Sequence, residues 1–223
     1  MPATLDLSPD ELLTTTRAVR RRLDFERPVP LALVQECVQI ALQAPSGSNA
    51  RGWHFVVVGD PAKRQAIAEL YRKAFDGYRS MPVSAHALAE KAEGDDVATM
   101  RGVVGSAEAL AANLHRAPYL VIPCLEGRLP AIEGPMGQLA QASQFGSILP
   151  AFWSFMLAAR ARGLGTSWTT LHLLHEQEVA ELLGIPFASV MQTALSPLAF
   201  TQGADFKPAK HRDLEGALHV DAW

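Results

Sequence analysis

The chain reads Ala44-Pro45-Ser46-Gly47-Ser48-Asn49-Ala50-Arg51-Gly52-Trp53 between two strongly patterned segments. Upstream, apolar residues recur at helical spacing and predict a helix that begins near Pro30, with a stripe of Leu31, Val34, Val38, Ala41 and Leu42. Downstream, residues 53–58 are β-branched and aromatic and predict a buried strand. The quoted stretch combines proline, glycine, asparagine and hydroxyls, so it is a loop that can press its backbone against a flat ligand.

Further helices and strands are expected on both sides of this loop. Ser8 and Glu11 predict a capping box for a helix that turns Leu12 and Leu13 inward and runs toward Arg17. Helical patterns also cover residues 61–75, 147–162 and 175–183, and the second of these is apolar on nearly every side. Strands are expected at residues 119–125, 166–169 and 191–200.

The remaining segments lack such patterns. Residues 76–105 are polar and weakly periodic, which favours a surface excursion or lid with some helix, and the tail over residues 201–223 is irregular. No glycine loop joins the first strand to a helix, so a dinucleotide-binding fingerprint is absent. Residues 1–223 are therefore expected to form one domain of the α+β, or loosely α/β, class in which helices cover a small central sheet.

Composition narrows the functional classes. The 223 residues are 48% hydrophobic with a formal net charge of −3, which excludes a disordered chain and argues against nucleic-acid binding. Cys37 and Cys124 are expected to be buried thiols in a reducing compartment, since two cysteines cannot staple a chain of this length. The apolar run 146–161 contains Pro150 and is too short to span a membrane, and no secretion signal is expected at the N-terminus. A cytoplasmic protein without membrane association is expected.

Four arginines crowd the segment Arg17-Ala18-Val19-Arg20-Arg21-Arg22. On a helix, Arg17, Arg20 and Arg21 would share one face. The segment is either a solvated helix face or an anion site, because guanidinium groups bind phosphate in a planar, bidentate way. In the tail, Lys210 and Arg212 stand at alternate positions and, in an extended chain, would close together on an anion.

Residues 162–171 contain two glycines, which are expected to end the long helix and turn the chain into a strand. Thr169, Thr170 and Leu171 then lie at the strand exit, where backbone N–H groups can face a ligand. His172 and His175 have the spacing of a metal-binding pair, but the sequence places no third ligand beside them. They are expected to be histidines at a helix start, and no metal site is expected.

Taken together, these motifs resemble those of the nitroreductase family of FMN-dependent enzymes. The resemblance is carried by the order and spacing of Arg17-Ala18-Val19-Arg20, Pro28-Val29-Pro30 and the 44–53 stretch. It continues through His115-Arg116-Ala117-Pro118, residues 161–166 and Lys210-His211-Arg212. It implies an α+β homodimer with a small, mostly antiparallel sheet flanked by helices and with two FMN sites at the subunit interface.

Carried over residue by residue, the resemblance assigns Arg17, Lys210 and Arg212 to the FMN phosphate. It places Arg20 at the pyrimidine edge, where its charge favours the anionic reduced flavin. From the other subunit, the flavin would be contacted by Pro45, Ser46 and Gly47, with Asn49 close by. At the strand exit, the backbone amides of Thr169, Thr170 and Leu171 would lie near the flavin N5 and O4.

Three departures from the family pattern affect these assignments. Ala18 replaces a serine, so that only its backbone amide can serve the phosphate, and Arg51-Gly52 replaces Gln-Pro. The aromatic residue that follows the arginines is displaced, since Leu23 and Phe25 compete for its position. This displacement leaves open the register of the cofactor-binding segment after Arg17, Ala18 and Val19. Arg20 and Arg21 are therefore both candidates for the flavin contact.

The resemblance implies an oxidoreductase in which hydride passes from NADH or NADPH to flavin N5 and then to a nitro, quinone or related small-molecule acceptor. Both partners would use one face of the ring, which implies ping-pong kinetics, and the flavin carries the chemistry without a catalytic side chain. A flavin-sequestering or flavin-modifying protein of the same fold is the alternative. A nucleic-acid or anion binder that uses residues 17–22 is disfavoured by the acidic net charge.

Overall fold

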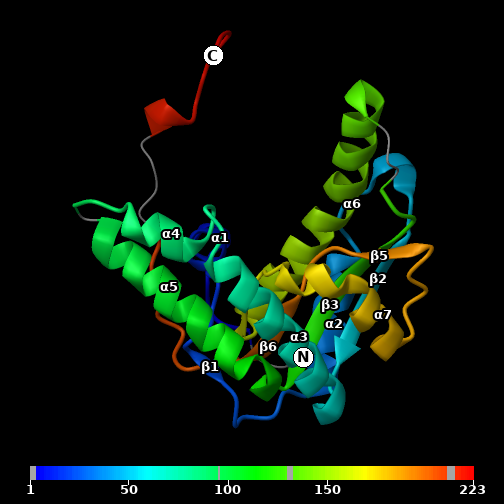
Figure 1. The fold of residues 1–223 in the computed structure, drawn as a ribbon, viewed down its shortest axis with the longest axis horizontal. Helices are drawn as coiled ribbons and strands as arrows, with labels where there is room; N and C mark the ends of the chain where they lie inside the picture. The colour runs from blue at the N-terminus through cyan, green and yellow to red at the C-terminus, as the bar shows by residue number, and fades with distance from the viewer. Residues whose placement is uncertain (1–3, 95, 130–132, 210–213) are drawn as a thin grey trace.

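The computed structural model describes residues 4–94, 96–129, 133–209 and 214–223. At its centre lies a six-stranded sheet, formed by β1 (Leu23–Asp24), β2 (Trp53–Val58), β3 (Tyr119–Glu126), β4 (Leu164–Thr166), β5 (Val190–Gln192) and β6 (Ser196–Thr201). Around it run the helices shown in Figure 1, which are α1 (Pro9–Thr15), α2 (Leu31–Ala41), α3 (Pro61–Arg79), α4 (Ala85–Glu90), α5 (Asp96–Asn113), α6 (Gly134–Ala161) and α7 (Glu176–Leu183).

The strands of the sheet pair in antiparallel fashion. The main path runs β1-β6-β3-β2, while β4 pairs with β6 and β5 pairs with β3. Within this register Val57 lies opposite Val121, and Gly165 lies opposite Ala199. The expected α+β fold with a small antiparallel sheet flanked by helices is confirmed.

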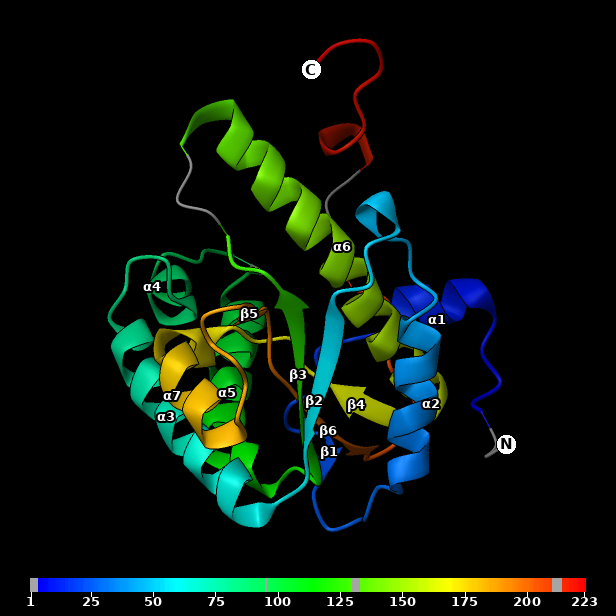
Figure 2. The same ribbon diagram turned by 90° about the vertical axis from the view of Figure 1, so that its right-hand side faces the viewer.

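Two helical layers cover the sheet, as Figure 2 shows. Helices α2 and α6 pack on one face, where Val34, Phe152 and Phe155 surround Val121 of β3. Helices α3, α5 and α7 pack on the other face, around the next residue of the same strand, Ile122. Successive side chains of a strand point to opposite faces, so β3 contributes to both cores.

Several predicted elements are confirmed in detail. The N–H of Glu11 donates to Ser8 Oγ at 3.2 Å, and the N–H of Ser8 donates to Glu11 Oε2 at 2.8 Å, which completes the capping box. Helices α2, α3 and α7 and strands β2 and β3 begin at or next to the predicted residues. Cys37 and Cys124 are buried free thiols, and burial raises their pKa values to about 11 and about 12.

The arginine segment is not a helix, so the predicted shared helical face of Arg17, Arg20 and Arg21 is wrong. Helix α1 ends at Thr15, and the chain then runs beside β4. There the Val19 N–H donates to the Thr166 carbonyl at 2.8 Å. This pairing holds the backbone extended.

Some boundaries also differ from the predictions. Helix α6 begins at Gly134 rather than Ser147 and accommodates Pro150 in its interior. Residues 76–105 are mostly helical, since they hold the end of α3, all of α4 and the first part of α5. The predicted strand at 166–169 is β4 at 164–166, and the run 191–200 divides into β5 and β6.

Burial departs from the predicted stripes at three leucines. Leu13, Leu31 and Leu42 are about half exposed, at 54%, 50% and 48%. Strand β2 is only half-buried over most of its length, because it lies at the end of the strand order and has β3 as its one neighbour within the described residues. No helix in the described ranges combines the length and the apolar character that crossing a membrane requires.

Candidate functional site

The arginine segment lies directly against the end of β4. Ala18 bridges Thr166, and Val19 packs with Leu23 and Ala199. A Cβ at Gly165 would lie 3.0 Å or less from atoms of three residues, Val19, Leu23 and Thr201. Glycine therefore permits the close approach, and the flanking arginines project from a tightly packed backbone.

Two guanidinium groups flank the C-terminal end of α1. Arg17 donates hydrogen bonds of 2.8–3.1 Å to three backbone carbonyls, those of Thr14, Thr16 and Lys207. Arg160, in the last turn of α6, is only 3% exposed and donates to Thr15 Oγ1 and the Ala204 carbonyl. Its Nε and Nη1 atoms have no partner among the described residues. Neither arginine forms an ion pair with a carboxylate of the described chain.

Arg20 joins the arginine segment to α3 and the strand exit. Its half-buried guanidinium donates one long hydrogen bond, 3.4 Å, to Ser106 Oγ, and burial lowers its pKa. The charge of Arg20 also acts on the buried Tyr71 phenol, whose pKa is raised by burial. The Tyr71 hydroxyl lies 3.0 Å from Thr169 Oγ1. Three distant parts of the sequence thus converge on one cation that has no carboxylate partner within the described ranges.

The neighbouring arginines turn elsewhere. Arg21 Nε donates to the Gly105 carbonyl of α5 at 3.3 Å. Arg22 pairs with the Asp205 carboxylate, and its guanidinium lies 4.3 Å from the centre of the Phe206 ring. Of the two arginines that the sequence left as candidates for the flavin contact, Arg20 is the one whose charge acts at the strand exit.

The strand exit is packed more tightly than the sequence predicted. The Thr169 N–H, expected to face a ligand, instead donates to the Leu195 carbonyl at 2.9 Å, and the Leu195 N–H donates back at 2.8 Å. Thr170 is exposed, and Leu171 begins the 3₁₀ helix Leu171–His175. The polar groups of this region that remain available lie at Thr170 and beyond.

The loop of Pro45, Ser46, Gly47 and Asn49 lies apart from these residues. Gly47–Asn49 forms a 3₁₀ turn beside the N-terminal half of α6, where Gly47 faces Ser143, on the opposite side of Figure 1 from α1. Most of the loop is exposed, and Ser48 and Asn49 adopt positive φ angles of 53° and 55°. One chain therefore does not bring this loop to the arginine segment. Lys210 and Arg212 lie outside the described residues.

The two histidines of the pair lie in different surroundings. His172 is fully buried, both of its ring nitrogens lack partners among the described residues, and burial lowers its pKa to about 3. His175 Nδ1 is paired with Glu178. Within the described ranges, no group of three or more histidine, cysteine, aspartate or glutamate residues is placed to hold a metal ion.

The sequence did not single out Arg160, Ser106 or Tyr71 as site residues. Arg160 carries a usable signal, because an arginine interrupts an otherwise apolar helix and charged residues are almost never fully buried without a partner. Tyr71 carries no such signal, since its contact with Thr169 joins residues far apart in the sequence.

Comparisons with known proteins agree with this fold. A model of the Nitroreductase family matches residues 13–196. A putative NADH dehydrogenase/NAD(P)H nitroreductase of Methanothermobacter thermautotrophicus is 25% identical over 221 residues, 96% of this chain and 86% of that protein. A 5,6-dimethylbenzimidazole synthase of Rhodospirillum rubrum is 28% identical over 160 residues, 71% of this chain and 67% of that protein.

A solved structure has the same fold. The crystal structure of oxidized iodotyrosine deiodinase bound to FMN and 3-iodo-L-tyrosine superposes with a TM-score of 0.63, at 22% identity, and covers 92% of this chain and 94% of that one. The family match extends from α1 to the start of β6 and so includes the arginine segment, Tyr71 and the strand exit. On this evidence the chain belongs to the Nitroreductase family.

Proposed function

We propose that this protein is an FMN-dependent oxidoreductase that takes hydride from NADH or NADPH and passes it to a nitro, quinone or related small-molecule acceptor. One observation carries the proposal, the half-buried Arg20 guanidinium, which acts on Tyr71 beside the strand exit and forms no ion pair with a carboxylate of the described residues. Such a cation needs an external negative charge, because a partly buried charge is costly when it is unpaired. The family match supports a flavin as its source.

The donors present fit FMN. A phosphate group accepts planar, paired hydrogen bonds from guanidinium, and each guanidinium has five N–H donors. Arg160 keeps two nitrogen atoms buried and unpartnered within the described chain, and Arg17 uses only three N–H groups, all on backbone carbonyls. We assign the phosphate to Arg17, joined by Lys210 and Arg212 of the tail, and we place Arg160 beside them.

FMN, when bound, supplies a centre at N5 that accepts hydride and passes it on. The residues of this chain orient it and tune its charge. Arg20 places a fixed positive charge in a partly buried position, where it stabilises negative charge that a bound ligand gains on reduction. Tyr71 and Thr169 form the wall beside Arg20, and no side chain is needed as a nucleophile or general base.

A second copy of the chain completes this proposed site. Most of the loop that holds Pro45, Ser46, Gly47 and Asn49 is exposed, and it lies on the opposite side of Figure 1 from α1, so it would contact the flavin only as part of a homodimer. The projecting half of α6 and the terminal segment expose apolar side chains that such a dimer would cover, among them Met136, Leu139, Leu218 and Trp223.

Purified protein tests the proposal directly. We expect it to be yellow, or to take up added FMN, and to oxidise NADH or NADPH in the presence of a nitroaromatic compound or a quinone. Arg20→Gln should weaken FMN binding, whereas Arg101→Gln, which removes an exposed charge from α5, should leave it unchanged. A colourless protein that does not take up FMN would contradict the proposal.

The relative named 5,6-dimethylbenzimidazole synthase favours a second candidate, a flavin-modifying or flavin-sequestering protein. The two candidates separate under anaerobic conditions. Bound flavin that loses its yellow colour when NADH or NADPH is added supports the oxidoreductase. Bound flavin that neither nicotinamide reduces supports the alternative.

A further inference from the structure

Residues 202–207, which we name the strap, follow β6 and run past the arginine segment and the end of α6. Most of the strap is exposed, and Phe206 is its one half-buried residue. Three of its backbone carbonyls accept hydrogen bonds of 2.9–3.1 Å from different arginines, in the pairs Gln202–Arg22, Ala204–Arg160 and Lys207–Arg17. Arginine side chains therefore hold a segment that buries little of its own surface.

Phe206 attaches the strap to the core. Its ring packs against a small buried cluster formed by β1, β6 and the arginine segment. The ring centre lies 4.3 Å from the Arg22 guanidinium and 4.8 Å from that of Arg160, distances at which an aromatic face attracts a cation. Burial and the charge of Arg22 both lower the pKa of Arg160, so the two cations repel each other. The ring therefore stabilises a pair of like charges and fixes the strap beside them.

A turn at Gly203 lets the strap fold back onto Arg22. Gly203 has a φ of 77°, and a Cβ there would lie 2.7 Å from Arg22 Nη2 and 3.0 Å from Asp205 Oδ1. Glycine therefore leaves room for the ion pair between Arg22 and Asp205. The Asp205 side chain is 85% exposed, so we expect this ion pair to contribute less than the half-buried Phe206 ring.

The last residue of the strap orients Arg17. The Lys207 carbonyl accepts from Arg17 Nε at 3.1 Å, and the carbonyls of Thr14 and Thr16 accept from its two Nη atoms at 2.8 and 3.0 Å. The guanidinium is thus held at Nε by the strap and at both Nη atoms by the end of α1, and two of its five N–H groups remain for a ligand. A long side chain that is ordered in advance loses less entropy when a ligand binds.

We propose that the strap, through Phe206, positions Arg17 for the phosphate group of FMN and so sets the preference of the site for FMN over flavins that lack a phosphate. This inference rests on the proposed function, which assigns the flavin phosphate to Arg17. Riboflavin has the same ring system as FMN, which Arg20 would contact, but no phosphate. The strap should therefore act on FMN binding and not on riboflavin binding. Phe206 is a positioning residue, because it acts through Arg17.

Flavin fluorescence titrations of the full-length protein with FMN and with riboflavin test this role. Phe206→Leu keeps an apolar side chain against the core but removes the aromatic face beside Arg22 and Arg160. It should weaken FMN binding about fivefold, the cost of immobilising one long side chain, and leave riboflavin binding unchanged, which also shows that the variant is folded. Phe187→Leu is the matched control, since it removes a ring whose centre lies 4.2 Å from the Arg128 guanidinium, and it should change neither affinity.

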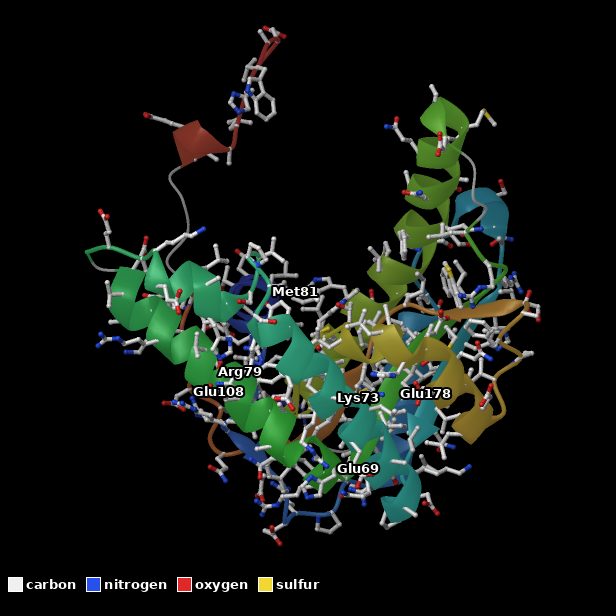
Figure 3. All side chains as sticks on the ribbon, in the orientation of Figure 1. Glu69, Lys73, Arg79, Met81, Glu108 and Glu178 are labelled. Atoms are coloured by element: carbon white, nitrogen blue, oxygen red, sulfur yellow. The ribbon has the colours of Figure 1, made fainter. Side chains whose placement is uncertain are left out.

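Two further variants locate the effect. In an Arg17→Ala background, Phe206→Leu should cause no additional loss of FMN affinity, because the side chain that the strap positions is absent. Asp205→Asn should weaken FMN binding only about twofold, because its ion pair is exposed. The control for Asp205→Asn is Glu108→Gln, which should bind FMN as the wild type does. Glu108 of α5 pairs with Arg79 of α3 at 3.6 Å, and Figure 3 shows the two side by side.

The opposite results would overturn the inference. If Phe206→Leu weakens FMN and riboflavin binding equally, the strap only stabilises the fold. If Phe206→Leu changes neither affinity, or weakens FMN binding further in the Arg17→Ala background, the strap does not act through Arg17. Wild-type protein that binds neither flavin would overturn the proposed function as well, whereas the other results leave the proposed function in place.

Discussion

The strand exit at residues 165–171 and the loop at residues 44–53 share residue types but differ in their surroundings. Both combine glycine with hydroxyl side chains beside a strand. At the strand exit, a Cβ on Gly165 would overlap three neighbours, whereas a Cβ on Gly47 would make one ordinary contact of 3.4 Å with Ser143. The first region is followed by the buried His172, and the second by His54, whose side chain is 52% exposed.

This difference indicates which polar groups are free to act. The strand exit uses its own chain to satisfy most of its atoms and leaves one half-buried cation, Arg20, to be neutralised. The loop directs most of its surface outward, so its partners must come from another molecule. The tightly packed strand exit can position a ligand within one chain. The exposed loop can contribute to a binding site only after another molecule associates with it.

Gly165→Ala should give the largest effect on stability. A methyl group would sit 2.8–3.0 Å from atoms of Val19, Leu23 and Thr201, and overpacking of this kind costs about 1–3 kcal/mol. Urea unfolding of the variant measures the loss, with Gly47→Ala as its control. Equal stability of the two variants would remove the contrast between the regions.

His172→Phe should flatten the acid side of the stability profile. His172 stays neutral in the fold because burial lowers its pKa to about 3, whereas in the unfolded chain it ionises near 6.5. The unfolded state therefore binds the extra proton below pH 6.5, and stability falls by about 1.4 kcal/mol per pH unit as the pH drops from 6.5 toward 3.

Unfolding at pH 7 and pH 5 tests this slope. His172→Phe should lose it, and His54→Gln, which changes the exposed histidine after the loop, should retain it. A slope that persists in His172→Phe would have another origin.

Arg17→Ala should weaken FMN binding about tenfold or more, since a hydrogen bond to a charged group contributes about 1.5–3 kcal/mol. Arg17→Lys should lie between the wild type and the alanine variant, because lysine keeps the charge but not the planar fork. Flavin fluorescence during titration measures the affinity. Unchanged affinity in Arg17→Ala would remove this residue from the proposed phosphate site.

Gly47→Ala should give the smallest effect on stability, within about 0.5 kcal/mol, because the new methyl group fits within the chain. If a second copy brings this loop to the flavin, the same variant should still weaken FMN binding severalfold. A variant that matches the wild type in both measurements would exclude close approach of a ligand at Gly47.

The sequence predicted those elements that depend only on neighbouring residues. The Ser8 capping box, the β-branched run of β2 and the turn glycine at residue 163, with φ of 73°, follow from neighbouring residues alone. The start of α6 was missed because residues 134–146 carry glycine, serine and glutamine rather than an apolar stripe. The exposure of Leu13, Leu31 and Leu42 depends on which other elements pack against them, and this cannot be read from a helical pattern.

The candidate site was predictable only in part. Family motifs located Arg17, Arg20 and Thr169, which the structure places beside β4 or at its exit. The extended path of the arginine segment could not be predicted, because it depends on pairing with Thr166, far along the chain. Tyr71 and Arg160 likewise join the candidate site through contacts with residues far along the chain, Thr169 and Thr15.

The two ends of α6 should open independently in a single chain. The segment after Pro150 holds Ala151, Phe152 and Phe155 with no exposure, whereas the first turns of the helix expose Met136 and Leu139. A helical segment of roughly three turns with little tertiary cover is marginal in water. In hydrogen exchange on the monomer, the amides of residues 134–144 should therefore exchange through local opening and those of residues 151–161 only through global unfolding, and a second copy that covers Met136 and Leu139 should slow the first group.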